Sequence, residues 1–504
     1  MFHRFSTTAP RRVFRSAIAA VIVFSPGLLR AQTESPTTLS IEQAIQLARE
    51  NNPLFLQTKN DVDVSRSAVR SAIGGLLPTA NINNSYGYTA GGERRAESVV
   101  LAQQPGYYSG SYSLGVSYRL SGAAILEPSV QRSQKRAVER RVAGSGANLD
   151  GQVAQQYLTV LQARDQTAQA EKEVARLNEY VKLAQAKLDV GAGTPLEVRS
   201  AEVDAGTAEV ALIRARNDAA TAAITLGQLI GLTVEPEVAL TSKFTLFEPK
   251  WTAQDLVQIA LQANPTLLAA NASESAAKTQ VKSARTAYLP SLGLNLGWQG
   301  SVYQASDINP LVQSSLQQTG QAFQSCQQSN ALAVLLNQAP RDCSPYDTNN
   351  PAVEAQIRDQ LRSENSGFPF GYTRQPMSAG ITISLPIFQG FSRQLQVDQA
   401  RAAAADARFQ VRSEELRLRQ EVSTGVRNLQ TAYQTALLDD KVRVNAEEQL
   451  RLAQERFRFG AANSIEVTDA QAKLSKAEQD QISATYDFHK YLAALEALVG
   501  RPLR

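Results

Sequence analysis

Two spacings of apolar residues follow each other along this chain. Over residues 122–189 and again over residues 390–458, apolar side chains recur every three or four positions, as at Leu177, Val181 and Ala184. That spacing predicts long helices with one packed face. At 1.5 Å per residue, each would extend roughly 100 Å, a length typical of a coiled-coil-like assembly.

Four other stretches alternate with a period of two: residues 79–90, 110–121, 291–303 and 374–388. Aliphatic side chains on one side and Ser, Gly or Asn on the other fit a β-barrel wall between lipid and water. A soluble sandwich alternates in the same way, but here a polar loop joins each strand pair and the flanking chain is helical. Because four strands cannot enclose water, the pattern predicts a barrel shared by several copies.

The same order of elements occurs twice, in residues 32–250 and 251–504. Asn52-Pro53 is matched by Asn264-Pro265, which lies 212 residues later. We therefore expect a tandem duplication. The second repeat differs by a long polar loop, residues 303–371, between its two strands.

Each long helix needs a partner of similar length, and two shorter helices stacked end to end would supply it. Summed helix lengths match if residues 195–230 stack with 265–289 beside the first long helix, and residues 464–499 stack with 53–77 beside the second.

A helical hairpin is expected at residues 189–197. Gly191 can take the left-handed conformation that ends a helix without steric cost. Thr194, Pro195 and Glu197 then supply a capping hydroxyl, a proline at the first helical position and a glutamate at the third.

The second repeat carries the corresponding hairpin at residues 458–469. Gly460 ends the first helix, Asn463 is the cap of the next one and Glu466 occupies its third position. Both turns therefore have the residues that a short helix–turn–helix connection requires.

The first 31 residues are predicted to be an export signal. Five arginines and no acid accompany an apolar run that is too short to span a membrane, and Ala31 suits cleavage. Arg11-Arg12 resembles a twin-arginine signal, although a general secretory signal is the favoured interpretation. Without these residues, 46 basic side chains face 47 acidic ones, so nothing indicates a nucleic-acid partner.

Few residues are candidates for a disulfide, a metal site or catalysis. Cys326 and Cys343 lie close together in a polar region, and in an oxidising compartment we expect them to pair. The two histidines, His3 and His489, are far from them in sequence, so no metal site is expected. A nucleophile–histidine pair and a phosphate-binding loop are also absent from the sequence, which predicts neither an enzyme nor a cofactor.

Taken together, the repeated helix–strand–strand–helix order, the Asn-Pro and Leu-Pro pairs and the two glycine-containing hairpins resemble the TolC-type outer-membrane efflux proteins. The resemblance implies an α+β membrane protein. Three subunits with four strands each would form a twelve-stranded barrel in the outer membrane, continuous with an α-helical tunnel across the periplasm. The hairpins would gate its inner tip and contact a periplasmic adaptor and an inner-membrane pump.

The resemblance also implies a ring of acids at that tip. Glu466 and Asp469 in the second repeat, and Glu197 in the first, match the family's acidic positions. Glu197 and Glu466 could equally be capping residues, whereas Asp469 lies a turn further into its helix and is the favoured selectivity residue. The family's entrance arginine corresponds to Ala462, which is not basic.

The leading function is therefore the exit duct of a tripartite efflux system for small toxic molecules. A duct for type I protein secretion is the alternative within the family. A periplasmic coiled-coil adaptor, from a different class, is disfavoured because adaptors lack four lipid-facing strands. Residues 303–371 could be an extracellular cap over the barrel or a surface insertion without function.

Overall fold

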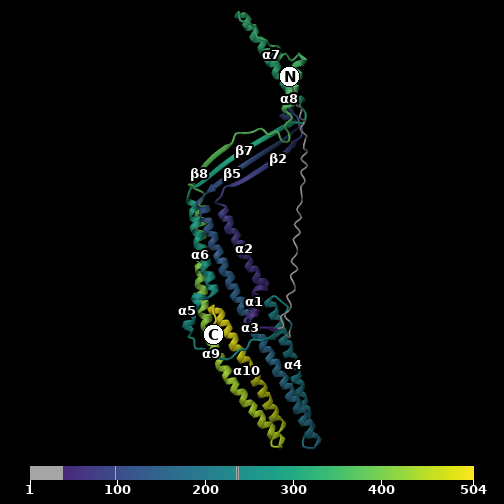
Figure 1. The fold of residues 1–504 in the computed structure, drawn as a ribbon, viewed down its shortest axis with the longest axis vertical. Helices are drawn as coiled ribbons and strands as arrows, with labels where there is room; N and C mark the ends of the chain where they lie inside the picture. Colours follow the sequence, from purple (N-terminus) through teal and green to yellow (C-terminus); the bar gives the residue numbers. More distant parts are fainter. Residues whose placement is uncertain (1–37, 97, 234, 236–237, 504) are drawn as a thin grey trace, which may run out of the picture.

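The computed structural model describes residues 38–96, 98–233, 235 and 238–503 (Figure 1). The predicted export signal, residues 1–31, lies outside the described residues. The described chain is elongated. A slanted sheet lies between two projecting helices at one end and a bundle of long helices at the other (Figure 1).

The sheet has four antiparallel strands in the order β2, β5, β7, β8. Their bounds are β2 Thr79–Thr89, β5 Tyr107–Leu120, β7 Ser291–Ala305 and β8 Ser378–Ser384. The prediction of a strand over residues 374–388 is too long. Pro376 and Pro386 flank β8, and proline lacks the N–H that a ladder needs. Before β8, single bonds from Thr373 N to Ser301 O (2.8 Å) and Gln375 N to Gln299 O (3.2 Å) continue the pairing.

Two connections contain elements that the sequence did not predict. A hairpin of β3 (Gly92–Ala96) and β4 (Val99–Gln104) lies between β2 and β5. The predicted loop 303–371 is also wrong in part, because it holds α7 (Asn309–Leu335) and α8 (Pro351–Glu364). Each helix has a single buried residue, Val312 in α7 and Val353 in α8, so neither has a continuous packed apolar face.

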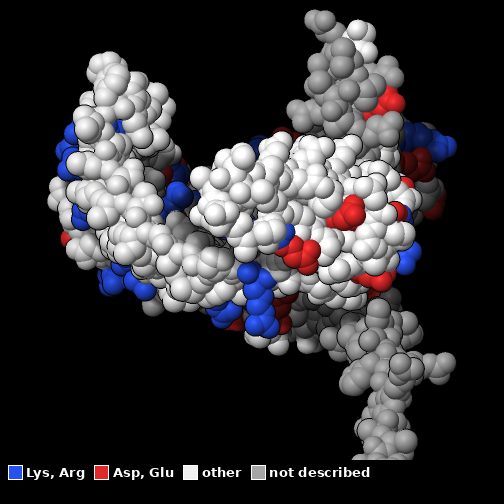
Figure 2. Space-filling model, turned by 90° about the horizontal axis from the view of Figure 1, so that it is seen from above, with Lys and Arg blue, Asp and Glu red and all other residues white. Residues whose placement is uncertain are grey.

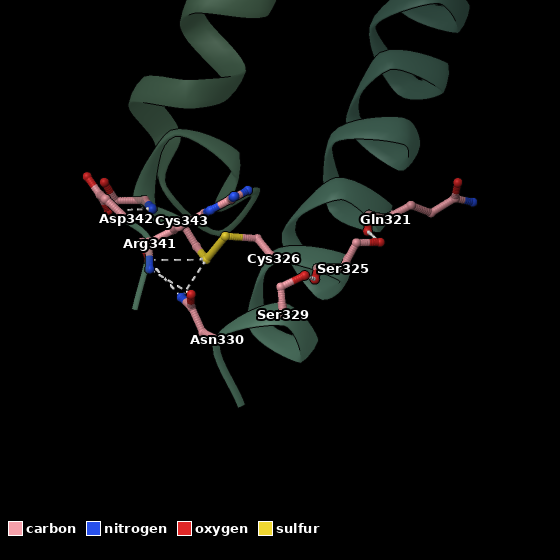
Figure 3. Close-up of a disulfide and its surroundings, with 9 residues drawn as sticks. Gln321, Ser325, Cys326, Ser329, Asn330, Arg341, Asp342 and Cys343 are labelled. Atoms are coloured by element: carbon pink, nitrogen blue, oxygen red, sulfur yellow. Dashed lines mark hydrogen bonds between the residues drawn. A yellow bond between two sulfur atoms is a disulfide. The ribbon is translucent and has the colours of Figure 1, made fainter. Parts of the chain in front are cut away.

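A disulfide between Cys326 and Cys343 fastens the segment after α7 back onto that helix (Figure 3). The two Cα atoms are 5.9 Å apart. Asn330 strengthens the same contact, because its amide donates to Arg341 O and accepts from Arg341 N, both at 2.7 Å. The disulfide and these hydrogen bonds thus hold the end of α7 and the segment that follows it.

The two long helices are α3 (Gly122–Asp189) and α9 (Ser392–Arg458), with 68 and 67 residues. Each turns back through a hairpin, α3 into α4 (Pro195–Ile230) and α9 into α10 (Ser464–Val499). Within the chain, α4 packs on α3, α3 packs on α10, and α10 packs on α9. The lower ends of the four helices therefore form a row with α4 and α9 at its edges (Figure 1).

The shorter helices stack differently from the predicted pairs. Four of them matter: α1 (Ile41–Asn51), α2 (Pro53–Gly74), α5 (Ala253–Ala263) and α6 (Pro265–Arg285). The end of α4 meets the α1–α2 junction, and the end of α10 meets the α5–α6 junction. Thus α4 continues into α2 and α10 into α6, the reverse of the predicted pairing. Strand order does not decide between the two pairings, because β5 lies between β2 and β7 and α3 contacts both α2 and α6. The junction contacts decide it.

Both junctions are built on a buried asparagine. Asn52 caps α2 by accepting from Phe55 N at 2.9 Å, and its amide donates to Leu229 O at 2.9 Å. Asn264 does the same in the second half, accepting from Leu267 N at 2.8 Å and donating to Leu498 O at 2.9 Å. One side chain thereby satisfies a backbone N–H at the start of one helix and a backbone carbonyl at the end of another.

Each arriving helix ends on a left-handed glycine. Gly231 has φ +80°, and a Cβ there would lie 2.4 Å from Asn51 O. Gly500 has φ +76°, and a Cβ there would lie 2.7 Å from Ala263 O. Any other residue would be strained in backbone conformation and would also separate the two helices.

Apolar clusters surround these junctions in the middle of the molecule. The cluster at the first junction includes Leu39, Tyr157 and Leu226, and the cluster at the second includes Leu418, Phe488 and Leu492. No helix among the described residues is long and apolar enough to cross a membrane.

We predict that Asn264→Ala destabilises the protein by about 1–3 kcal/mol, because it removes a helix cap and leaves the Leu498 carbonyl without its donor. Denaturant unfolding followed by helical circular dichroism measures this. The control Asn271→Ala changes an exposed asparagine on the same helix and should leave stability unchanged or slightly higher. Equal stability of the two variants would contradict the role of the junction.

Candidate functional site at the hairpin tips

The first tip has the predicted capping box. Thr194 Oγ1 accepts from Glu197 N at 3.3 Å, and Glu197 Oε2 accepts from Thr194 N at 2.9 Å. Gly191 has φ +76° and Pro195 is the first residue of α4. The Glu197 carboxylate is therefore used to close the turn.

The second tip is built differently. Asn463 caps α10 by accepting from Glu466 N at 3.0 Å, and Gly460 has φ +73°. The Glu466 carboxylate does not return to the cap. It pairs with Arg456 of α9, whose guanidinium also donates to Ala461 O at 3.2 Å. The sequence analysis missed Arg456, although a basic residue in the last turn of a helix is a recognised signal.

Asp469 lies one turn further along α10 and forms an ion pair with Lys473 at 2.7 Å. Both side chains are more than half exposed, so the pair is screened by water and its energy is small. Ala462, the position of the expected arginine, is partly buried against the tip cluster. Arg456 is thus the cation that holds the turn here.

The two tips are tied to each other through Lys187 of α3. Its ammonium donates to Phe457 O at 2.7 Å and lies 3.5 Å from the centre of the Phe457 ring. Tyr180 packs against the same ring, with 5.8 Å between ring centroids. An apolar cluster to which all four helices contribute surrounds this contact.

A polar contact joins the two returning helices just above the tips. Thr468 of α10 donates to Asp204 of α4 at 3.4 Å. Burial, together with the negative charges of Glu197 and Asp204, raises the pKa of Tyr180 to about 12. The tyrosine therefore stays neutral at physiological pH and acts as a packing residue.

Further up, α3 and α10 share a charged network. Arg176 donates to both oxygens of Glu478, at 3.1 and 2.5 Å, and also pairs with Glu173 one turn away. Burial raises the pKa of Glu173, and the positive charge of Arg176 opposes that shift. The sequence could suggest only the pairing of Glu173 with Arg176, because Glu478 lies 302 residues from Arg176.

The structure thus places Glu197 and Glu466 on neighbouring hairpins at the same end of the molecule (Figure 1). Among the described residues, no group of three or more His, Cys, Asp or Glu is arranged to hold a metal ion. On the face shown in Figure 2, basic and acidic side chains are interspersed and neither forms a broad patch.

Comparison with known proteins gives a consistent result. A family model described as "Outer membrane efflux protein" matches residues 44–232 and 348–501. The chain is 30% identical over 289 residues to outer membrane efflux protein BepC of Brucella suis, covering 56% of this chain and 59% of that protein. It is 25% identical over 252 residues to outer membrane protein TolC of Vibrio cholerae, covering 50% of this chain and 56% of that protein. Both alignments thus span less than two thirds of the relatives' length.

The fold is similar to a solved structure over nearly the whole chain. The outer membrane protein VceC from Vibrio cholerae superimposes with a TM-score of 0.67 at 16% identity, covering 92% of this chain and 97% of VceC. At that identity the likeness establishes the arrangement of strands and helices and leaves the chemistry of individual residues open.

Glu173 allows a test by pH. A carboxyl with a raised pKa binds its proton more tightly in the folded chain, so its contribution to stability is full below its unfolded pKa and is lost as pH rises through the folded pKa. The side chain in Glu173→Gln does not titrate, so the variant does not lose this stability as pH rises. The melting temperature of the variant relative to the wild type should therefore be higher at about pH 7 than at about pH 4.

Glu179→Gln, which removes one exposed charge from the same helix, is the control for this experiment. The melting temperature of Glu173→Gln is compared with that of the wild type at each pH. If this difference does not rise with pH, the proposed cost of burying the charged Glu173 carboxylate is contradicted.

Proposed function

The chain belongs to the outer membrane efflux protein family, and we propose that it is the exit duct of a tripartite efflux system. It lies in the outer membrane with its helices extending into the periplasm. In our proposal it is a passive conduit for small toxic molecules, which an inner-membrane pump delivers through a periplasmic adaptor. The energy comes from the pump, so the duct needs no catalytic residue or cofactor.

The observation that carries this proposal is the pair of open edges on the sheet. In the described chain, β2 and β8 each pair on one side only, and both strands are exposed along their whole length. Unpaired backbone groups are costly in lipid, where water cannot satisfy them. Joining β8 of one copy to β2 of the next would remove both edges, and three copies would close a twelve-stranded barrel.

The helices support the same head-to-tail assembly. The free edge of α4 carries exposed apolar residues seven positions apart, and α9 at the opposite edge carries another such series. They are Leu196, Val203, Val210 and Ile224 on α4, and Leu395, Phe409, Leu416, Leu437 and Val444 on α9, several of them separated by multiples of seven. A seven-residue repeat is the pattern by which long helices pack side by side. We propose that α9 of one subunit packs on α4 of the next.

We further propose that the chain arose by tandem duplication, with residues 32–250 and 251–504 as its halves. The order of α1, α2, β2, β5, α3 and α4 is repeated by α5, α6, β7, β8, α9 and α10, and Asn52 and Asn264 form the same junction in each. The α7–α8 insertion at the far end of the sheet interrupts the second half. We propose that it lies outside the cell, over the mouth of the barrel.

At the periplasmic end, the proposed entrance is formed by six hairpins, two from each subunit. Asp469 is our choice of selectivity residue, because its carboxylate is exposed and its only described ion pair is with a flexible surface lysine. Glu466 and Glu197 contribute charge but are committed to their own turns. The summed field of such carboxylates would attract cations to the opening.

We expect the double variant Val203→Asp/Val210→Asp to be monomeric, because charges on the edge of α4 cannot be buried against a second copy. Size-exclusion chromatography with light scattering in detergent measures this. The matched variant Val203→Thr/Val210→Thr keeps the side-chain shape and should remain trimeric. A trimeric aspartate variant would refute the interface.

We expect Asp469→Ala to weaken cation preference and block by multivalent cations in planar-bilayer recordings, since it removes a carboxylate and frees the charge of Lys473. Asp440→Ala is the control, because Asp440 pairs with Arg443 on α9 in a similar exposed bridge far from the tip. The selectivity role fails if both variants conduct like the wild type.

A further inference from the structure

A cavity of about 410 Å³ lies above the hairpin tips, between α3, α4 and α10. Its size falls in the range of small-molecule sites. Leu177 of α3 and Ala208 and Ala211 of α4 give it an apolar side, and polar residues of α10 line the opposite side. None of the three entrance acids belongs to it, so it is separate from the proposed selectivity ring.

Gln471 of α10 lines this cavity with an unused amide. The residue is only 3% exposed, and neither Oε1 nor Nε2 has a hydrogen-bond partner within the described chain. Buried amides in folded proteins nearly always have partners. A ligand in the cavity could both donate to Oε1 and accept from Nε2.

The walls carry more negative than positive charge. Glu173 of α3 and Asp204 of α4 line the cavity, and Lys476 of α10 is the one base in the described lining. Glu173 pairs with Arg176, which lies outside the lining and also pairs with Glu478. In the part of the chain that the structure describes, no lysine or arginine pairs with Asp204, which accepts only the long bond from Thr468. The lining lysine, Lys476, pairs with Asp480 at 3.1 Å. The cavity therefore favours a cation.

We propose that this cavity binds a small organic cation, consisting of an ammonium or amidinium group on an apolar body. The charged group pairs with Asp204, the amide of Gln471 supplies a hydrogen bond, and the body lies against Leu177 and Ala208. Such a ligand bridges α4 to α10, between which the structure describes one hydrogen bond here, from Thr468 to Asp204. Occupancy holds the two hairpins together, whatever the duct exports.

The test uses benzamidinium and its uncharged analogue benzamide on the full-length protein in detergent. Both native cysteines are in the disulfide, so Thr207→Cys places the only free thiol on the cavity wall. We expect benzamidinium to slow maleimide labelling of this thiol, whereas benzamide has little effect. Thr221→Cys, exposed on the same helix but outside the cavity, should label at the same rate with or without either compound.

In the Thr207→Cys background, Asp204→Asn should raise the benzamidinium concentration for half-protection at least about tenfold, because a charge-assisted bond is lost. Gln471→Leu should also weaken protection. Glu202→Gln removes a neighbouring exposed carboxylate that pairs with Arg199, and should have no effect.

Equal protection by benzamide, protection of Thr221→Cys, no protection at all, or full protection with Asp204→Asn would each overturn the proposal. Should Gln471→Leu fail to fold, the Asp204→Asn result decides. No transport is measured, so the outcome is independent of the proposed export function.

Discussion

The double use of a buried asparagine is the interaction on which the long axis of this molecule depends. Asn52 and Asn264 each cap one helix and donate to a carbonyl in the last turn of another, so that the two helices continue as one column beside a long helix. Gly231 and Gly500 allow the close approach, because a Cβ at either position would collide with the opposing backbone. Through these junctions the strands at one end and the hairpins at the other keep a defined relation.

The single chain is nevertheless incomplete at its sides. Among the described strands, β2 and β8 each lack a partner on one side, and exposed apolar residues lie on α4 and α9, the two edge helices of the row. In our proposal these edges join in a head-to-tail ring. Such a heterologous contact forms a closed object only when the rotation per copy divides a full turn. In the proposed ring, the sheet and the long helices would share the same rotation per copy, and the asparagine junctions hold the helix columns in line between them.

At the inner end, the two hairpins have similar chain geometry but different electrostatics. The Glu197 carboxylate accepts from the backbone N–H of its own cap residue, whereas the Glu466 carboxylate forms an ion pair with Arg456. Lys187 then ties one tip to the other through Phe457, and the cavity above them leaves a carboxylate and an amide without strong partners. The tip is thus held by a few polar contacts around an apolar core to which all four helices contribute.

Local sequence determined the elements with strong local signals. Apolar periodicity marked the long helices and the strands, and the residues Gly191, Thr194 and Asn463 marked the turns, because capping and left-handed glycine act within a few residues. The sequence did not predict α7, α8 or the β3–β4 hairpin, because their periodicity is weak. The prediction that paired helices by their summed lengths assigned the wrong partners to the helix columns. The tertiary structure alone decided those columns, the pairing of Arg176 with Glu478, and the cavity around Gln471. Each depends on groups brought together by the fold, and sequence spacing carries no information about distances between groups hundreds of residues apart.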